Sequence, residues 1–206
     1  HRNVYINAYN FIAHLRIRHE DREMWTLPMF HANGWGGPFA ITAMGATHVV
    51  LRAVVGADIY QMLQDEQITF ACMAPAVLST VLNFPDKTSY RATTRPRFVV
   101  AGAPPPAAFI ERLEKELGWE FIQIYGLTET APFASFLGSR WIETKLGSAG
   151  QPPLYGDVRV VDAQNRPLTH GERGEVCVRA PNVMKGYWNR PEATREAIDP
   201  EGWFHT

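Results

Sequence analysis

The stretch Phe98–Ile124, FVVAGAPPPAAFIERLEKELGWEFIQI, decides the fold class, because it contains an apolar run, a helical pattern and a second apolar run. The runs Phe98–Ala101 and Phe121–Ile124 have the length of buried strands. Between them, Pro106–Leu117 shows apolar residues at helical spacing, which form one buried face: Phe109, Ile110, Leu113 and Leu117. Gly118 is typical of the residue that ends a helix. We therefore predict a strand–helix–strand unit.

The same alternation extends towards the N-terminus. Strands are predicted at Met24–Phe30, Thr47–Leu51 and Ile68–Met73, and helices at Gly34–Met44, at Ala57–Glu66 and from Pro75 onwards. Strands that alternate with helices need crossover connections, so we expect an α/β fold with a mainly parallel sheet. Ligands of such sheets bind beyond the carboxyl ends of the strands. This rule directs attention to the loops that follow Phe30, Ala101 and Ile124.

The pattern changes beyond about Thr130. Asp157–Val161 and Glu175–Arg179 alternate apolar and polar residues, and polar turn residues lie between them. This arrangement predicts a hairpin in a small antiparallel, barrel-like β unit. We expect an α/β subdomain over residues 1–140 and a β-rich subdomain, partial in this chain, over residues 141–206.

Composition and charge exclude several classes of protein. The chain has 206 residues, of which 46 % are hydrophobic and 20 % charged, so it is not disordered. A net charge of −1 without a basic face argues against nucleic-acid binding. No apolar run approaches the roughly 20 residues of a membrane span. Cys72 and Cys177 lie in apolar surroundings and show neither metal-ligand spacing nor a disulfide framework, so we predict core positions and a cytoplasmic protein.

Two further groups of residues are expected to be structural. His1, His14 and His19 are predicted to lie on a solvated helix face, and Trp119, Trp188 and Trp203 are predicted to pack inside.

One segment carries the parts of a nucleotide site. In Tyr125–Thr130 (YGLTET), Tyr125 offers a flat ring and Gly126 permits close approach of the backbone. Thr128 and Glu129 offer hydroxyl and carboxylate oxygens, which suit a phosphate and Mg²⁺. The alternative is an ordinary polar loop with a helix N-cap at Thr128.

This segment resembles the adenine- and Mg²⁺-binding signature of the adenylate-forming (AMP-binding) superfamily, which comprises acyl-CoA synthetases, luciferases and peptide-synthetase adenylation domains. Further blocks resemble the same family in the same order: Pro28–Trp35, Ala101–Pro105, Lys145–Pro152, Gly174–Arg179, Lys185–Glu192 and Gly202–Thr206. Each block is moderately specific, and together they span nearly the whole chain. Pro28–Trp35 and Val183–Trp188 are most similar to the fatty-acyl and medium-chain acyl-CoA synthetase branch, with its aryl and methylthio-acid relatives.

The resemblance implies a set of site residues within the 1–140 subdomain. The implied nucleotide-binding residues are Gly102, Ala103, Pro104, Gln123, Ile124, Tyr125, Gly126 and Thr128, with Tyr125 stacked on the adenine. The implied catalytic residues are Thr128, Glu129 and His31, and Glu129 is the implied metal ligand. The implied substrate-binding residues are His31, Trp35, Gly102 and Gly126, with Trp35 as an aromatic gate on the acyl pocket.

Structural alternatives stand beside three of these assignments. His31 follows an apolar run and could be a half-buried, hydrogen-bonded histidine. Trp35 could belong to the core with Phe30 and Phe39. The segment from Gly102 to Pro106 could be only a tight strand-to-helix turn, a reading compatible with the functional one.

The implied activity is ATP-dependent activation of a carboxylic acid through an acyl-adenylate to an acyl-CoA thioester, with ATP, Mg²⁺ and CoA required. A homodimer is compatible with the resemblance. One alternative is an adenylating enzyme that loads a carrier protein, and another is a non-catalytic acyl- or nucleotide-binding module. The identity of the acid stays open, because Trp35 and the small residues around Gly34 suit short, medium or aryl chains.

The resemblance also implies parts that the 206 residues do not contain. The family's lysine-bearing phosphate loop is expected just before His1, its ribose-binding Asp just after Thr206, and its mobile C-terminal domain beyond that. We therefore expect an internal segment of a longer enzyme that makes no acyl-adenylate by itself, because each lost electrostatic donor costs about 10²–10³-fold in rate.

Overall fold

The computed structural model describes residues 1–142, 144–145 and 147–206. The α-helices are α1 (Arg2–Leu15), α2 (Gly37–Ala43), α3 (Gly56–Asp65), α4 (Pro75–Asn83), α5 (Ala107–Arg112) and α6 (Pro191–Ala197). The strands are β1 (Arg22–Trp25), β2 (Thr47–Val50), β3 (Phe70–Met73), β4 (Arg97–Val100), β5 (Glu120–Tyr125), β6 (Ser135–Leu137), β7 (Asp157–Val161), β8 (Glu175–Arg179) and β9 (Phe204–His205).

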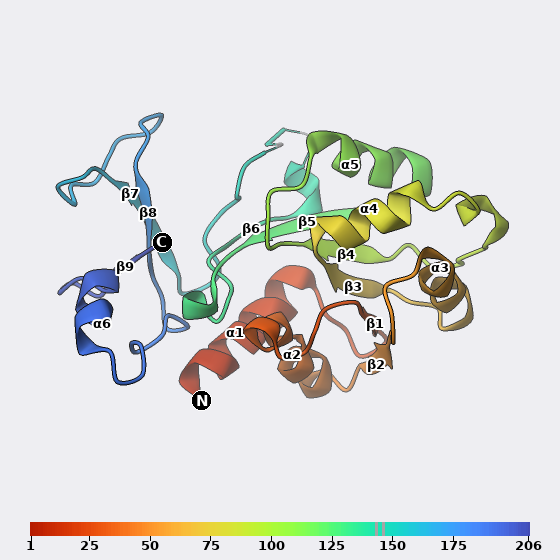
Figure 1. The fold of residues 1–206 in the computed structure, drawn as a ribbon, viewed down its shortest axis with the longest axis horizontal. Helices are drawn as coiled ribbons and strands as arrows, with labels where there is room; N and C mark the ends of the chain where they lie inside the picture. Colours follow the sequence, from red (N-terminus) through yellow and green to blue (C-terminus); the bar gives the residue numbers. More distant parts are fainter. Residues whose placement is uncertain (143, 146) are drawn as a thin grey trace.

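The large sheet has the strand order β2-β1-β3-β4-β5-β6 and confirms the predicted α/β class. Its strands pair in parallel except β6, which runs antiparallel to β5. Helices α1 and α2 cover one face of the sheet, and α3, α4 and α5 cover the other (Figure 1).

Alternation along the central strands explains this sandwich. In β3, Phe70 and Cys72 pack with α1 and α2, whereas Ala71 and Met73 pack with α3, α4 and α5. A strand buried on both faces reads as a continuous apolar run, and all four residues of β3 are buried.

Several element boundaries differ from the predicted ones. The predicted strand Met24–Phe30 ends at Trp25, and the chain then turns before Pro28, whose nitrogen cannot donate a sheet hydrogen bond. The predicted helix Gly34–Met44 is a 3₁₀ segment over His31–Gly36, here called η1, followed by α2. Edge strand β6 was not predicted, because it is only three residues long.

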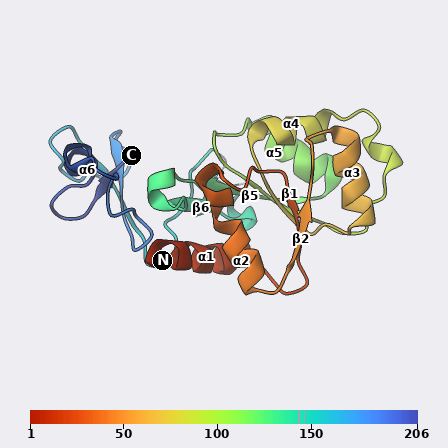
Figure 2. The ribbon, with the colours of Figure 1, turned by 60° about the horizontal axis from the view of Figure 1, so that its bottom comes forward.

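The second sheet is small and antiparallel, with the order β7-β8-β9, and lies with α6 to one side of the large sheet (Figure 1 and Figure 2). It contains the predicted hairpin with the expected bounds, and β9 adds a short third strand. Its apolar cluster contains Val178, Val183 and Phe204, together with Ala134 from the segment before β6. The small sheet is thereby packed against the loop region that follows β5.

Two structural expectations were wrong. His14 is half-buried rather than solvated, because its ring lies 4.1 Å from the ring of Phe136 and its Nε2 accepts a hydrogen bond from the Leu154 amide at 2.9 Å. Trp188 is 90 % exposed, whereas Trp119 and Trp203 are buried as expected. Trp188 lies in a turn beyond the small sheet, where no second layer of the described structure covers its ring.

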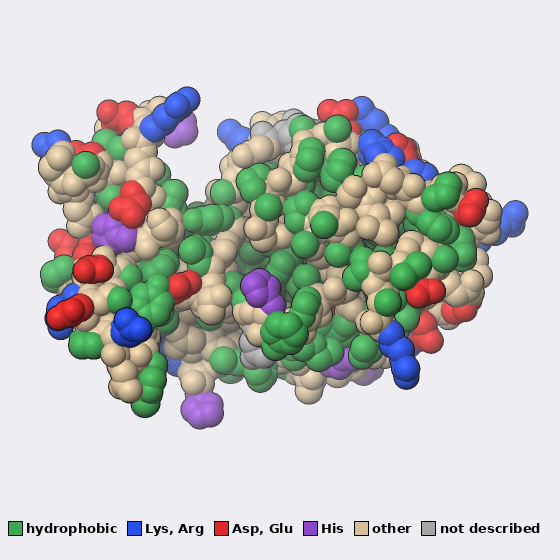
Figure 3. All heavy atoms as spheres, in the orientation of Figure 1, with side chains coloured by type: hydrophobic (Ala, Val, Ile, Leu, Met, Phe, Trp, Pro, Cys, Tyr) green, Lys and Arg blue, Asp and Glu red, His purple; other side chains and the backbone are tan. Residues whose placement is uncertain are grey.

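Within the described residues, no helix has the length and apolar character needed to cross a bilayer. On the face shown in Figure 3, acidic and basic side chains are interspersed, which agrees with the near-neutral net charge.

A buried carboxyl group lies beneath the start of α2. Glu23 on β1 is almost fully buried, and burial raises its pKa to about 8, opposed by a hydrogen bond with the Cys72 thiol. The carboxyl therefore stays protonated in the folded protein at pH values where the unfolded chain, with a pKa near 4.5, has lost the proton.

This difference predicts a pH dependence of stability. Because the folded state holds the extra proton, the free energy of unfolding falls as pH rises from about 5 to 8, by about 1 kcal/mol per pH unit at most. Urea unfolding of the wild type and of Glu23→Gln across pH 5–9 measures it, and the variant is expected to lose this slope. Equal slopes in both proteins would contradict the assignment.

Candidate active site

A cavity of about 320 Å³ opens at the carboxyl edge of the large sheet. It lies beyond the ends of β4 and β5 and beside η1, the segment that follows β1. These are the loops to which the rule for parallel sheets directed attention. The cavity brings together seven of the residues predicted for the site: His31, Trp35, Gly102, Ile124, Gly126, Thr128 and Glu129.

The η1 segment forms one wall of the cavity. Trp35 is 7 % exposed and packs with the core beneath α1 and α2, while His31 is exposed at the mouth. Asn7 of α1 donates a hydrogen bond to the Trp35 carbonyl at 3.0 Å. Ala32 and Trp35 have φ values of 42° and 58°, which L-residues adopt only with strain. Such strain is concentrated at functional sites, where the surrounding structure holds it in place.

The opposite wall is the loop after β5. Gly126 passes so close to the following segment that an added Cβ would lie 1.4 Å from the Pro132 carbonyl oxygen. Thr128–Thr130 then forms a single 3₁₀ turn, in which the Thr130 hydroxyl accepts a hydrogen bond from the Leu127 amide at 3.1 Å. Glycine at position 126 is therefore a steric requirement of this loop.

The segment Asn182–Tyr187 holds this loop from the side of the small sheet. The buried Asn182 side-chain amide donates to the carbonyls of Thr130 and Phe133. The Met184 amide donates to the Glu129 carbonyl at 2.8 Å. The loop that carries Thr128 and Glu129 is thus fixed by both sheets.

Glu129 has a partner that sequence reasoning did not single out. The Tyr187 hydroxyl donates a hydrogen bond to Glu129 Oε1 at 2.8 Å, and this bond raises the pKa of Tyr187. Tyr187 belongs to the Lys185–Glu192 block, so the signal was present, but nothing along the chain links positions 58 residues apart. Thr128 and Glu129 both line the cavity, and hydroxyl and carboxylate oxygens are hard donors of the kind that suits Mg²⁺.

Four of the predicted residues do not line the cavity. Ala103 and Pro104 are exposed on the loop after β4. Gln123 is buried within β5, and Tyr125 at the end of β5 donates a hydrogen bond to the Thr206 hydroxyl at 3.1 Å. In the predicted Lys145–Pro152 block, Leu146 lies outside the described residues.

A second cavity of about 270 Å³ adjoins the first and shares Ala32 and Thr128 with it. Asn7 and the exposed rings of Phe30 and Phe39 also line it. Space is therefore present on both sides of η1.

Comparison with known proteins gives a match to the family model described as "AMP-binding enzyme", over residues 1–188. Among curated proteins, the chain is 33 % identical to a feruloyl-CoA synthase of Amycolatopsis sp, over 100 % of this chain and 42 % of the relative. The chain thus spans about two fifths of that relative's length.

Solved structures show the same similarity. The inhibitor-bound N-terminal domain of FACL13 from Mycobacterium tuberculosis superposes with a TM-score of 0.92 at 31 % identity, covering 100 % of this chain and 51 % of that one. The o-succinylbenzoate CoA synthetase of Bacillus subtilis, in complex with ATP and a magnesium ion, gives a TM-score of 0.87 at 28 % identity, covering 99 % and 42 %.

Proposed function

We propose, from the premise that this chain belongs to the AMP-binding enzyme family, that the intact protein activates a carboxylic acid with ATP and transfers the acyl group to CoA. The observation that carries this proposal is the single cavity that gathers His31, Trp35, Gly102, Thr128 and Glu129 at the carboxyl edge of the sheet. If the segment after β5 were only an ordinary polar loop, there would be no reason for these side chains to surround one cavity.

Each wall of the cavity has a proposed role in the adenylation step, in which the carboxylate attacks the α-phosphorus and pyrophosphate leaves. The loop of Gly102, Ala103 and Pro104 presents backbone to the adenine, and the Thr128 hydroxyl donates to a phosphate oxygen. Glu129 would hold Mg²⁺, which neutralises phosphate charge when bound. His31 stands at the mouth, where the carboxylate meets ATP and the thiol then enters.

Two residues that are predicted to contact the nucleotide, Tyr125 and Gln123, do not line the cavity and need a separate proposal. We propose that Tyr125 stacks on the adenine while its hydroxyl stays bonded to Thr206, so that the base lies between the two sheets. Gln123 borders the base from within β5, with Ile124 and Gly126 beside it.

The acid is proposed to be compact. The similar proteins named for feruloyl-CoA and o-succinylbenzoate CoA synthesis support an aryl acid. A buried Trp35 wall suits such a substrate because it limits depth and offers a flat apolar face.

The remaining assignments are part of the same proposal. Residues 1–140 and 141–206 are proposed as the two subdomains. A cytoplasmic location is supported by two buried, free cysteines. Dimer formation is a prediction that size-exclusion chromatography of the intact protein tests.

The decisive experiment uses the intact protein with ATP, Mg²⁺ and a panel of short, medium, long and aryl acids. Acid-dependent ATP–pyrophosphate exchange, followed by thioester formation with CoA, is the expected result. Exchange with transfer only to a carrier protein would favour the carrier-loading alternative. Acid or nucleotide binding without exchange would favour the non-catalytic binding module.

Trp35 supplies a specificity prediction. Trp35→Ala in the intact enzyme is expected to shift kcat/KM towards longer or bulkier acids, by at most about 0.8 kcal/mol for each methylene newly accommodated. Removing the ring is also expected to lower stability by about 3–5 kcal/mol. The chain-length profile and the melting temperature are measured together.

A matched variant separates the ring from the backbone. Trp35→Gly opens the same space but tolerates the φ of 58°, so it should be more stable than Trp35→Ala although glycine is usually the more destabilising residue. An unchanged acid profile in both variants, with a large fall in melting temperature, would assign Trp35 to the core alone.

A further inference from the structure

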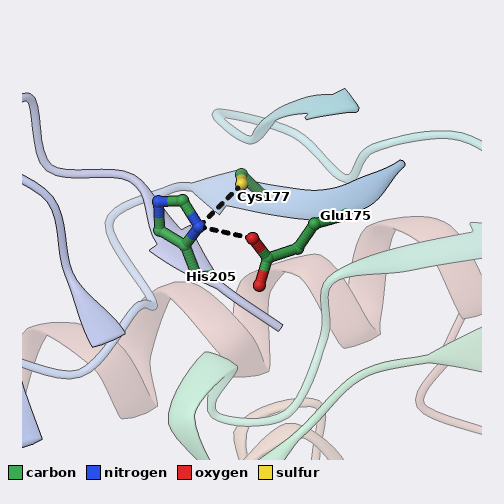
Figure 4. Close-up of side chains that lie close together, drawn as sticks. All are labelled: Glu175, Cys177 and His205. Atoms are coloured by element: carbon green, nitrogen blue, oxygen red, sulfur yellow. Dashed lines mark hydrogen bonds and ion pairs between the residues drawn. The ribbon is translucent and has the colours of Figure 1, made fainter. Parts of the chain in front are cut away.

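Three residues with metal-binding side chains meet on one face of the small sheet, away from the cavity. Cys177 on β8 lies directly opposite His205 on β9 in the strand register. Glu175 is two residues before Cys177 on β8, and side chains two apart on a strand project to the same face. Figure 4 shows the three side chains pointing towards one another from these two strands.

In this Glu175–Cys177–His205 cluster, the nitrogen–sulfur distance is that of two zinc ligands, and the nitrogen–oxygen distance is that of a hydrogen bond which an entering ion would open. His205 Nδ1 lies 2.8 Å from Glu175 Oε2 and 3.5 Å from Cys177 Sγ. Tetrahedral zinc, with bonds of about 2.3 Å to sulfur and 2.0 Å to nitrogen, places those two ligand atoms about 3.5 Å apart. One atom from each side chain lies within 4.8 Å of the other two.

The other nitrogen of His205 faces a carboxylate that is itself held in place. His205 Nε2 is 3.8 Å from Asp199 Oδ2. The same oxygen accepts hydrogen bonds from Arg159 and Asn165, while Oδ1 accepts from the amides of Glu201 and Trp203. At 3.8 Å this contact is an ion-pair distance and not a hydrogen bond, but it places a carboxylate behind the histidine, as in many zinc sites.

The nearby cation does not exclude a metal ion. The charge of Arg159 acts on the Cys177 thiol, but the guanidinium is paired with Asp199 at 3.0 Å and Glu201 at 3.4 Å. Burial, followed by the charge of Glu175, raises the pKa of the Cys177 thiol, and Arg159 only partly opposes this, so the free site holds a thiol. The thiol proton is released to solvent when the metal ion binds.

We propose that Glu175, Cys177 and His205 form a binding site for Zn²⁺, with water as the fourth ligand. The mixture of thiolate, imidazole and carboxylate selects zinc over Mg²⁺, which prefers oxygen alone. The ion reaches the site from the side of the exposed Glu175, and the buried sulfur forms its floor. This site shares no residue with the proposed adenylation site, and its ligands are separate from the proposed magnesium ligand Glu129.

A bound ion would tie the end of β9 to β8. Thr206 follows His205 directly, donates its amide to the Val176 carbonyl at 3.2 Å and accepts the Tyr125 hydroxyl bond. Zinc would therefore stabilise the contact between the small sheet and the end of β5.

The test is metal binding by the intact protein, with Co²⁺ as a spectroscopic probe and Zn²⁺ in calorimetric titration. Wild type is expected to show a thiolate-to-cobalt charge-transfer band, to bind Zn²⁺ at the site and to melt at a higher temperature with it. Cys177→Ser and His205→Gln are expected to lose the site-specific binding, with affinity lowered at least about 100-fold. Cys72→Ser and His170→Gln are the matched controls, because Cys72 is buried in the large sheet and His170 is exposed in a turn, and both should behave as wild type.

The variant Glu175→Gln distinguishes the loss of a metal ligand from a loss of folding. Its side chain is exposed, so the variant should fold as wild type by circular dichroism, yet bind Zn²⁺ more weakly. The proposal is overturned if wild type shows no charge-transfer band. It is equally overturned if wild type, Cys177→Ser and Glu175→Gln bind Zn²⁺ alike, since the ion would then lie elsewhere.

Discussion

Glu129→Gln in the intact enzyme is expected to lower the rate of acyl-adenylate formation by about 10²–10³-fold. Glutamine keeps the size of the side chain but removes the charge that a hard cation prefers. ATP–pyrophosphate exchange measured across Mg²⁺ concentrations should show both a lower maximum and a need for more Mg²⁺. Thioester formation from preformed acyl-adenylate should change by only a few fold, since pyrophosphate has already left.

Two variants sharpen this test. Tyr187→Phe removes the hydrogen bond at 2.8 Å but keeps the carboxylate, so it should lower the exchange rate much less than Glu129→Gln. Glu192→Gln neutralises an exposed carboxylate at the start of α6 and should leave both half-reactions unchanged. If Glu129→Gln slowed both half-reactions equally, or neither, Glu129 would not be the metal ligand.

Gly126→Ala is expected to abolish adenylation and to lower the free energy of unfolding by about 3 kcal/mol or more. The new Cβ would lie 1.4 Å from the Pro132 carbonyl oxygen and 2.6 Å from its carbon. That carbonyl cannot move freely, because the Ala134 amide bonds back to the Tyr125 carbonyl at 3.0 Å. Urea unfolding and ATP–pyrophosphate exchange measure the two effects.

Gly102→Ala is the comparison within the same cavity. A Cβ at Gly102 would meet nothing within 4 Å, but the residue has a φ of 91°. Gly102→Ala should therefore lower the free energy of unfolding by about 1 kcal/mol, through the backbone conformation alone. Equal losses of stability in the two variants would show that the close approach at Gly126 is not what confines this position to glycine.

The sequence predicted the fold class well because the sheet is buried on both faces. Runs such as Phe70–Met73 have little polar alternation, and the helices between them carry one apolar face. The predicted hairpin of Asp157–Val161 with Glu175–Arg179 was confirmed. It was predictable because its strands alternate apolar and polar residues, as strands of a half-exposed sheet do. Strand β6 was missed because three residues become a strand only through their register with β5.

The candidate site was predictable where it follows from strand ends. His31, Gly102 and Glu129 belong to loops that a parallel sheet places at one edge, so their meeting in one cavity follows from topology. Tyr187 was not predictable in this way, because it reaches Glu129 from beyond the first sheet. Cys177 and His205 likewise have no metal-ligand spacing along the chain, and only the register of β8 with β9 brings them together.

The hydrogen bond from the Met184 amide to the Glu129 carbonyl has a consequence for the slow dynamics of the protein. An amide in such a bond exchanges its hydrogen for deuterium only when the bond opens, here when the segment beside the small sheet lifts from the loop after β5. Magnesium and nucleotide held by that loop would oppose the opening and slow the exchange at Met184. This backbone amide is therefore a native reporter of ligand-linked opening between the two sheets, at a residue whose side chain takes no part in the proposed chemistry.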